Sequence, residues 1–271
     1  MKTKLLILSI AALCFSAAPA IADIYPTYSP LWGPGWPGED SLQTVFNNMT
    51  IAPTSGSSQV NTLTDALVDS WDSYWQPSAG GGAVATMIVE ITSGAGAQTF
   101  GIYDASAPTT KLEIFAGVDS PGASGKAFLT FYSDGTIKVA WDDGIPGPVT
   151  SAPFAVDALF RPTFGFYLNT WYSDNLLNSD NLDHMLAYQG KATNPDTVLI
   201  PPFASGDWTD NHFALAFEDG GTPSIWPAPG DGDYQDFVVL IESVVPVPLP
   251  AAVLLGILGL GVAGLKLRKY A

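Results

Sequence analysis

The sequence has very few of the residues that form covalent cross-links or bind zinc. It contains one cysteine, Cys14, and two histidines, His184 and His212. Cys14 lies in an N-terminal segment that we expect to be removed, so the mature chain would contain no disulfide bond. Two histidines without a cysteine also argue against a closed structural zinc site. The fold must therefore be stabilised by its apolar core and by any metal that oxygen ligands can bind.

Basic residues are also scarce. The segment from Asp23 to Glu242 contains all 26 acidic residues but only five of the ten basic ones, which gives a charge of about −21 with neutral histidines. A surface of this charge repels nucleic acid and attracts cations, so we expect no nucleic-acid partner. Aromatic residues make up 12% of the chain, which favours a folded core over an acidic disordered tail.

Motifs of common enzymes are missing. Neither H-E-x-x-H nor G-x-S-x-G occurs, and the glycine-containing run 122–126 departs from a phosphate-binding loop because Ala127 follows its lysine. We therefore predict no catalytic residues and no enzymatic activity. A glycoside hydrolase with two carboxylates leaves no sequence motif, so a secreted carbohydrate-active hydrolase stays open as the alternative.

The N-terminus has the pattern of a secretory signal peptide. Lys2 and Lys4 precede an apolar run over residues 5–15, and small residues follow it. Two overlapping A-x-A sites end at Ala20 and Ala22. We predict a signal peptide over residues 1–22, cleaved after Ala22, and hence an exported protein.

The C-terminal segment, residues 244–271, has the pattern of a membrane anchor. It carries no charge from Val244 to Leu265, which is long enough to cross a bilayer, and we predict a transmembrane helix over about residues 250–266. The basic cluster that follows would stop transfer and place the preceding chain outside the cytoplasm. Its members are Lys266, Arg268 and Lys269.

This segment resembles the PEP-CTERM type of bacterial sorting signal, which combines a short proline-containing motif, an apolar helix and a basic end. The motif matches the VPLPA variant through Val247, Pro248, Leu249, Pro250 and Ala251. The resemblance implies processing by an exosortase, a membrane transpeptidase-like enzyme, and transfer to the cell surface or exopolysaccharide matrix. Surface polysaccharide is then a further candidate partner. A plain single-span anchor is the alternative.

Between the two terminal segments the pattern predicts three parts. Residues 23–38 form an aromatic arm rich in proline and glycine, and residues 39–82 form a short helical lead-in. Leu42, Val45, Phe46 and Met49 predict one amphipathic helix, with Asp40 or Ser41 as its N-cap. A second helix is predicted by Val60, Leu63, Leu67 and Trp71, although its start also suits an extended chain.

Residues 83–243 have the pattern of a β domain. Alternating apolar residues occur over 87–91, 164–168 and 213–217, and further short apolar runs cover 100–103, 112–115, 128–132, 137–141 and 237–241. Short strands without regular intervening helices predict a mainly β fold, an antiparallel β-sandwich that is jelly-roll-like. Asp134-Gly135 predicts a hairpin between two of the strands.

Acidic residues gather at the ends of the last two predicted strands. Glu218 and Asp219 end one strand, and Asp231, Asp233 and Asp236 precede the other. Converging carboxylates repel one another, and a hard cation with six to eight oxygen ligands, such as Ca²⁺, relieves this repulsion. We predict a calcium site on these five residues, with a solvated acidic turn as the alternative. The spacing does not match an EF-hand.

The same residues carry a second resemblance. The segments 217–221 and 231–238 are similar to the "FED…D-x-DY-x-D" ending of an uncharacterised β-rich domain that recurs in PEP-CTERM and adhesin-like bacterial surface proteins. The chain departs from that pattern by the insertion of residues 222–230. The sequence thus predicts an exported, envelope- or matrix-associated protein with a structural or adhesive role, anchored first in the inner membrane.

Overall fold

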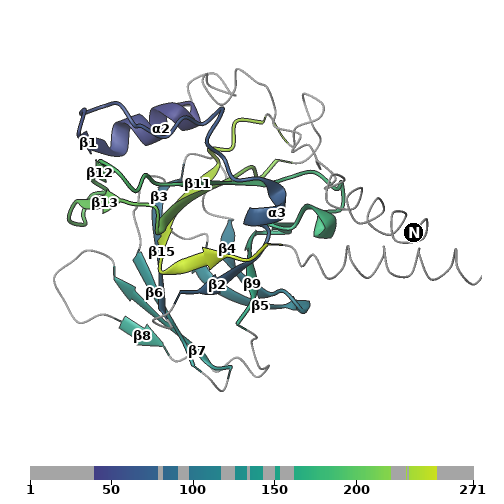
Figure 1. Cartoon of the computed structure of the whole chain (residues 1–271). Helices are drawn as coiled ribbons and strands as arrows, with labels where there is room; N and C mark the ends of the chain where they lie inside the picture. Colours follow the sequence, from purple (N-terminus) through teal and green to yellow (C-terminus); the bar gives the residue numbers. More distant parts are fainter. Residues whose placement is uncertain are drawn as a thin grey trace, which may run out of the picture.

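The computed structural model describes residues 40–78, 82–90, 98–116, 126–132, 135–142, 150–152, 162–220, 230 and 232–248, and it gives no side-chain environment for 82–90, 116, 141–142 and 150–152. The predicted signal peptide, the aromatic arm and most of the C-terminal segment lie outside these ranges. Within them the chain is mainly β and its strands pair antiparallel, as the alternating pattern predicts (Figure 1).

The largest sheet has seven strands in the order β11-β14-β15-β3-β6-β7-β8. Its middle strand is β3, which pairs with β15 although the two lie far apart in sequence. The bounds are β3 Gly82–Glu90, β6 Lys126–Phe131, β7 Ile137–Asp142, β8 Thr150–Ala152, β11 Met185–Gln189, β14 His212–Phe217 and β15 Phe237–Glu242. The predicted hairpin around Gly135 joins β6 to β7.

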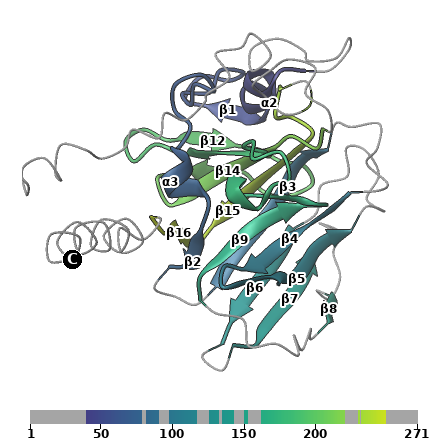
Figure 2. The same cartoon turned by 90° about the vertical axis from the view of Figure 1, so that its right-hand side faces the viewer.

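A second sheet has six strands, with β16-β2-β9-β4-β5 in order and β10 paired to β9. Its strands are β2 Trp75–Pro77, β4 Thr99–Asp104, β5 Ala107–Ala116, β9 Phe164–Leu168, β10 Trp171–Tyr172 and β16 Val244–Pro246. A short 3-10 helix, η3 Asn175–Leu177, follows β10. Figure 2 shows β9, β4 and β5 beside β6 and β7 of the larger sheet.

One apolar core draws its side chains from both of these sheets. Phe100 of β4 stacks on Phe166 of β9, with ring centroids 5.8 Å apart, and meets Phe217 of β14 edge-on at 5.8 Å. Trp75 of β2 is fully buried and meets Phe213 of β14 edge-on, with ring centroids 4.9 Å apart. Buried aromatic pairs contribute about 0.5–1.5 kcal/mol each beyond their area, so these contacts help to join the sheets.

The helical lead-in packs on the outer face of the seven-stranded sheet. Helix α2, Leu42–Met49, is capped by Ser41, whose hydroxyl accepts a hydrogen bond from Thr44 N at 3.1 Å. Its buried Phe46 meets Tyr188 of β11 and Trp208 of β13 edge-on. Beside it lies a three-stranded sheet, β1-β12-β13, of strands Thr50–Ala52, Asp196–Val198 and Gly206–Trp208. Together these elements bury a second core.

The second predicted helix is reduced to the four-residue α3, Asp69–Asp72. Leu63 and Trp71 are exposed although Val60 is buried, so the predicted spacing does not form one apolar face. Local side-chain hydrogen bonds replace the helical pattern, because Asn61 N donates to Asp65 Oδ2 at 3.0 Å and Leu63 N to Asn61 Oδ1 at 2.9 Å.

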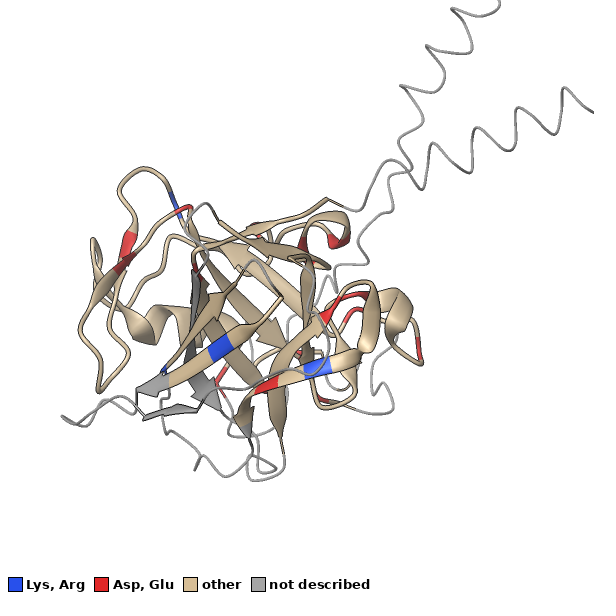
Figure 3. Ribbon diagram, turned by 90° about the horizontal axis from the view of Figure 1, so that it is seen from below, with Lys and Arg blue, Asp and Glu red and all other residues tan. Residues whose placement is uncertain are grey.

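The predicted C-terminal segment begins inside the domain. Val244–Pro246 is strand β16, which pairs with β2, and Val247 N donates to Tyr74 O at 2.7 Å. Among the described residues no helix has the length and apolarity that a membrane span needs. The predicted helix over 250–266 lies outside them. Figure 3 shows acidic positions spread over loops and strand ends, with few basic positions among them.

Candidate metal site

Three of the five predicted metal ligands lie together at one end of the β14–β15 pair. Phe217, the last residue of β14, is in register with Phe237, the first residue of β15. Glu218 and Asp219 therefore leave the sheet beside Asp236, which enters it. One carboxylate oxygen from each of Glu218, Asp219 and Asp236 lies within 4.8 Å of the other two.

Glu218 is buried and its carboxylate is held by backbone amides. Its side chain is 1% exposed. Oε2 accepts hydrogen bonds from Gly232 N at 3.1 Å and Tyr234 N at 3.3 Å, and Oε1 accepts from Gly220 N at 3.2 Å. Hydrogen bonds from backbone N–H groups favour the ionised form of a carboxylate. The loop is thus built around one carboxyl group, which three backbone amides hold in place.

Glycines allow the chain to approach this carboxylate. A Cβ atom on Gly230 would lie 2.0 Å from Glu218 Oε1, and one on Gly220 would lie 2.7 Å from the same oxygen. Gly230 and Gly232 also have positive φ values of 49° and 78°, which glycine adopts at little cost. The spacing of glycines in the loop is therefore required by Glu218.

Asp219 and Asp236 are linked through the backbone. Asp219 N donates to Asp236 Oδ2 at 2.7 Å, and Gln98 Nε2 donates to Asp219 Oδ2 at 2.6 Å. Burial, the charge and hydrogen bond of Glu218 and the charge of Asp219 together raise the pKa of Asp236 from 3.8 to about 11. In the absence of a cation, Asp236 therefore holds a proton at neutral pH.

This arrangement has two chemical solutions. Either Asp236 keeps its proton and donates it to Glu218, or a cation replaces that proton and contacts all three carboxylates. The donor set consists of oxygen alone, which suits a hard cation such as Ca²⁺ better than zinc. The residues present fit such an ion. The Glu218 carboxylate is held in position by backbone amides, and Asp236 needs only to lose its proton to become a third charged ligand.

Of the other two predicted ligands, only Asp233 can be placed, and it is not part of this group. Asp233 is buried, and its carboxylate accepts hydrogen bonds from Gln235 N at 3.2 Å and Gln235 Nε2 at 2.7 Å. It shapes the turn before β15, and it is not one of the three residues whose oxygens converge. Asp231 lies outside the described residues.

Sequence reasoning missed the residues behind the site. His184, which precedes β11, is fully buried and stacks on Trp171 of β10, with centroids 3.7 Å apart. Its Nδ1 lies 2.9 Å from Glu218 O and its Nε2 lies 3.0 Å from Asp180 Oδ2. Trp171 Nε1 donates to Asp219 O at 2.9 Å. No motif joins these positions, because the sheets bring them together.

A neighbouring acidic group lies on the far side of Tyr234. The Tyr234 hydroxyl donates to Asp183 O at 2.7 Å. Burial, together with the charges of Asp72 and Asp69 on α3, raises the pKa of Asp183 well above its usual value. Two groups of repelling carboxylates therefore flank one buried tyrosine.

Most residues of the predicted terminal signals cannot be placed. Val247 and Pro248 are described and follow β16, whereas Leu249, Pro250, Ala251, Lys266, Arg268 and Lys269 lie outside the described residues, as do Ala20 and Ala22. Comparison of the chain with protein-family models, with curated proteins and with solved structures gave no match, so any functional assignment depends on the residues themselves.

Proposed function

We propose that the chain is an exported, envelope- or matrix-associated protein with a structural or adhesive role, and that its β-sandwich holds Ca²⁺ on Glu218, Asp219 and Asp236. The observation that carries the calcium proposal is the convergence of these three carboxylates within 4.8 Å at the ends of two adjacent strands. The facing core residues of the two large sheets support a jelly-roll-like sandwich.

Calcium is the cation that best suits these ligands. It accepts six to eight oxygen ligands in flexible geometry, so three carboxylates with water molecules form an adequate shell. Magnesium demands tighter octahedral geometry and loses its water reluctantly, so we expect it to substitute poorly. The acidic surface of the chain, whose net charge is −16, would also concentrate divalent cations near the site.

The role of the ion would be to stabilise the fold. The three ligands lie where β14 ends and β15 begins, and both are interior strands of the seven-stranded sheet. A ligand that binds only the native state stabilises it by about 2.7 kcal/mol when its concentration is a hundred times Kd. For a mature chain without a disulfide bond this is a large share of the usual net stability.

Export and sorting rest on the terminal segments. The predicted signal peptide would be removed after Ala22, and N-terminal sequencing of the exported protein should begin at Asp23. A sequence that still begins at Met1 would refute this part of the proposal. The VPLPA-type segment would anchor the chain in the inner membrane until an exosortase processes it, leaving the domain on the surface or in the matrix.

The calcium proposal is tested by thermal unfolding of the full chain in detergent, in calcium-free buffer and in 100-fold excess calcium over Kd. A shorter chain that ends at residue 243 would lose β16. At about 2–4 °C per kcal/mol, the expected gain is roughly 5–10 °C. Asp236→Asn should remove most of this gain, whereas Asp210→Asn, an exposed turn residue, should keep it. Equal melting temperatures with and without calcium would refute the site.

A further inference from the structure

The point at which the chain leaves the domain is fixed by backbone hydrogen bonds. Strand β16 pairs with β2, and Val247 N then donates to Tyr74 O at 2.7 Å. The membrane helix that we predict begins at about residue 250, only three residues later. Three residues of extended chain span roughly 10 Å, so Tyr74 lies within about that distance of the start of the helix. The end of the domain around Tyr74 is therefore the end next to the bilayer.

Two short helices lie beside this exit point. The Tyr74 hydroxyl donates to Asp174, the N-cap of η3. Asn175 of η3 in turn donates from Nδ2 to Asp69 Oδ2 of α3 at 2.9 Å. Helix α3 ends two residues before Tyr74, and Figure 2 shows it beside β2 and β16. Hydrogen bonds thus join α3, η3 and the exit of the chain.

Large apolar side chains are exposed on these elements. Leu176 of η3 is 72% exposed, the highest value among the large apolar side chains that the structure describes, and Trp71 of α3 is 47% exposed. Val68, the N-cap of α3, and Val245 of β16 are exposed as well. Trp71 and Leu176 belong to neither apolar core, so the packing of the domain does not account for them.

The charge of this end indicates which lipids it can contact. The segments 68–76 and 171–183 contain five aspartates and no lysine or arginine. Lys111 offsets one of these charges, because its Nζ lies 4.3 Å from the centroid of the Tyr172 ring on β10. The end remains acidic and would be repelled by anionic lipid headgroups. Contact with a membrane must therefore be apolar, and zwitterionic headgroups permit it.

We propose that the α3–η3 end of the domain rests in the headgroup layer of a zwitterionic bilayer, with Trp71 and Leu176 as its apolar anchors. This inference rests on the proposed membrane helix. The headgroup layer is roughly 5–8 Å thick on each side of the hydrocarbon, so side chains this close to the exit point can reach it. Tryptophan suits this layer, because its ring is apolar and its N–H group is polar.

The test attaches a fluorophore to one cysteine of the full chain in phosphatidylcholine nanodiscs. A Cys14→Ser background leaves no other thiol. Leu176→Cys carries the probe in the patch, and Ile51→Cys is the matched control, an exposed apolar position on β1, which Figure 1 shows well away from α3. Lipids with a nitroxide near the headgroup should quench the probe at position 176 at least about threefold more than the probe at position 51, because only the first lies in the headgroup layer. Equal quenching would overturn the proposal.

A second probe position separates docking by these side chains from proximity imposed by the tether. Ser179→Cys places the fluorophore at an exposed polar residue shortly after η3. Replacing Trp71 and Leu176 together by Ser should lower the nitroxide quenching of this probe at least twofold. The matched control replaces two exposed apolar residues elsewhere, Ile51 and Leu199, by Ser and should leave the quenching unchanged. If loss of Trp71 and Leu176 also leaves it unchanged, these side chains are not anchors.

Failure of the contact and failure of the membrane helix give different results. A chain that does not elute with the nanodiscs would refute the helix, and the contact with it. A chain that elutes with them but shows no extra quenching at position 176 would refute the contact alone. Replacing part of the phosphatidylcholine by phosphatidylglycerol at low salt should lower the quenching at position 176. An increase would contradict an apolar contact on an acidic surface.

Discussion

Replacing Asp236 by Asn should change how stability depends on pH. In calcium-free protein the native state keeps a proton on Asp236, whose pKa is raised to about 11, and the unfolded chain loses that proton near pH 3.8. Native protein therefore binds more protons than unfolded protein across this window, so stability falls as pH rises. The slope for one proton is about 1.4 kcal/mol per pH unit. From pH 5 to pH 8 this amounts to at most about 4 kcal/mol.

The Asn side chain imitates the protonated carboxyl group. Its Nδ2 can donate to Glu218 as the carboxyl hydrogen does, and its Oδ1 can still accept from Asp219 N, which now lies 2.7 Å from Asp236 Oδ2. It has no proton to lose, so its contribution stays constant over this pH range. In calcium-free buffer at pH 8, Asp236→Asn should thus be the more stable protein.

Calcium should reverse this order. A bound cation replaces the proton, so the free energy of unfolding of wild type should depend less on pH when calcium is present. Because binding releases one proton, calcium affinity should rise about tenfold per pH unit. Asp236→Asn lacks one charged ligand and should gain little stability from calcium at any pH.

The measurement is urea unfolding followed by tryptophan fluorescence at pH 5, 6, 7 and 8, with and without calcium. Asp210→Asn is the control, because it also removes one carboxylate, and it should follow wild type throughout. The difference in free energy of unfolding between wild type and Asp236→Asn isolates the contribution of Asp236 from that of all other titrating groups. The result that would refute this reasoning is a free energy of unfolding that changes equally with pH in both calcium-free proteins. Asp236 would then not be held protonated by its neighbouring carboxylates.

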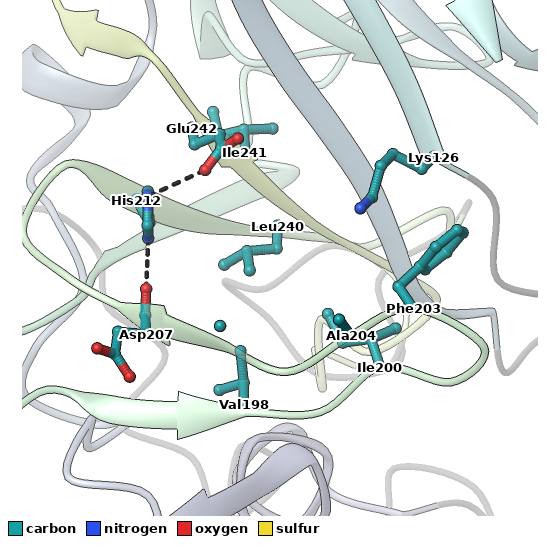
Figure 4. A pocket seen from close by; sticks show the side chains of 11 residues that line it. Lys126, Val198, Ile200, Phe203, Ala204, Asp207, His212, Leu240, Ile241 and Glu242 are labelled. Carbon is teal, nitrogen blue, oxygen red and sulfur yellow. Dashed lines mark hydrogen bonds and ion pairs between the residues drawn. The ribbon is translucent and has the colours of Figure 1, made fainter. Parts of the chain in front are cut away.

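Three further changes have expected outcomes. Gly230→Ala should destabilise the fold by more than Gly56→Ala, since both sites have positive φ but only at Gly230 would the new Cβ collide with a buried carboxylate oxygen; urea unfolding of both variants checks this. His212→Gln should lower the free energy of unfolding by up to about 1 kcal/mol below pH 6.5, because it removes the ion pair with Glu242 (Figure 4). Glu242 raises the pKa of His212 in the folded protein, so this loss should vanish as pH rises through that pKa, and a loss that grows with pH would contradict the pairing. Replacing Pro248 and Pro250 together by Ala should leave membrane insertion intact but block transfer beyond the inner membrane, so unchanged surface display in fractionated cells would reduce the tail to an anchor.

Strands and the first helix could be predicted because their signals are local. Phe164, Phe166 and Leu168 alternate and are buried in β9, and Ser41 caps α2 as its position before an amphipathic run predicts. Strand β16 was not predicted, because Val244–Pro246 also begins the uncharged C-terminal run. Its pairing with β2 depends on a contact about 170 residues away in sequence, which no local pattern reports.

The choice among the three aspartates of the last loop could not be predicted either. Alternation makes Asp231, Asp233 and Asp236 look equivalent, but backbone conformation separates Asp233 from Asp236. Tyr234 adopts a positive φ of 55° and Gly232 one of 78°. These turns direct the two residues' amides to Glu218 and leave the Asp233 carboxylate to cap Gln235 N. The ligand set therefore depends on the positive φ values of Gly232 and Tyr234, and only the glycine is a sequence signal for such a value.

Residues 222–230 lengthen the loop between the two acidic segments, but strand pairing still brings the ends of that loop together. The β14–β15 ladder runs unbroken from His212↔Glu242 to Phe217↔Phe237, so the positions of Glu218 and Asp236 are fixed by strand pairing and not by the loop between them. The entropy of loop closure grows only as the logarithm of length, about 0.6 kcal/mol for each doubling. A longer loop therefore costs little as long as both of its ends belong to the same ladder. The carboxylates would lose their convergence only if the register slipped, which would also expose the buried Phe217 and Phe237.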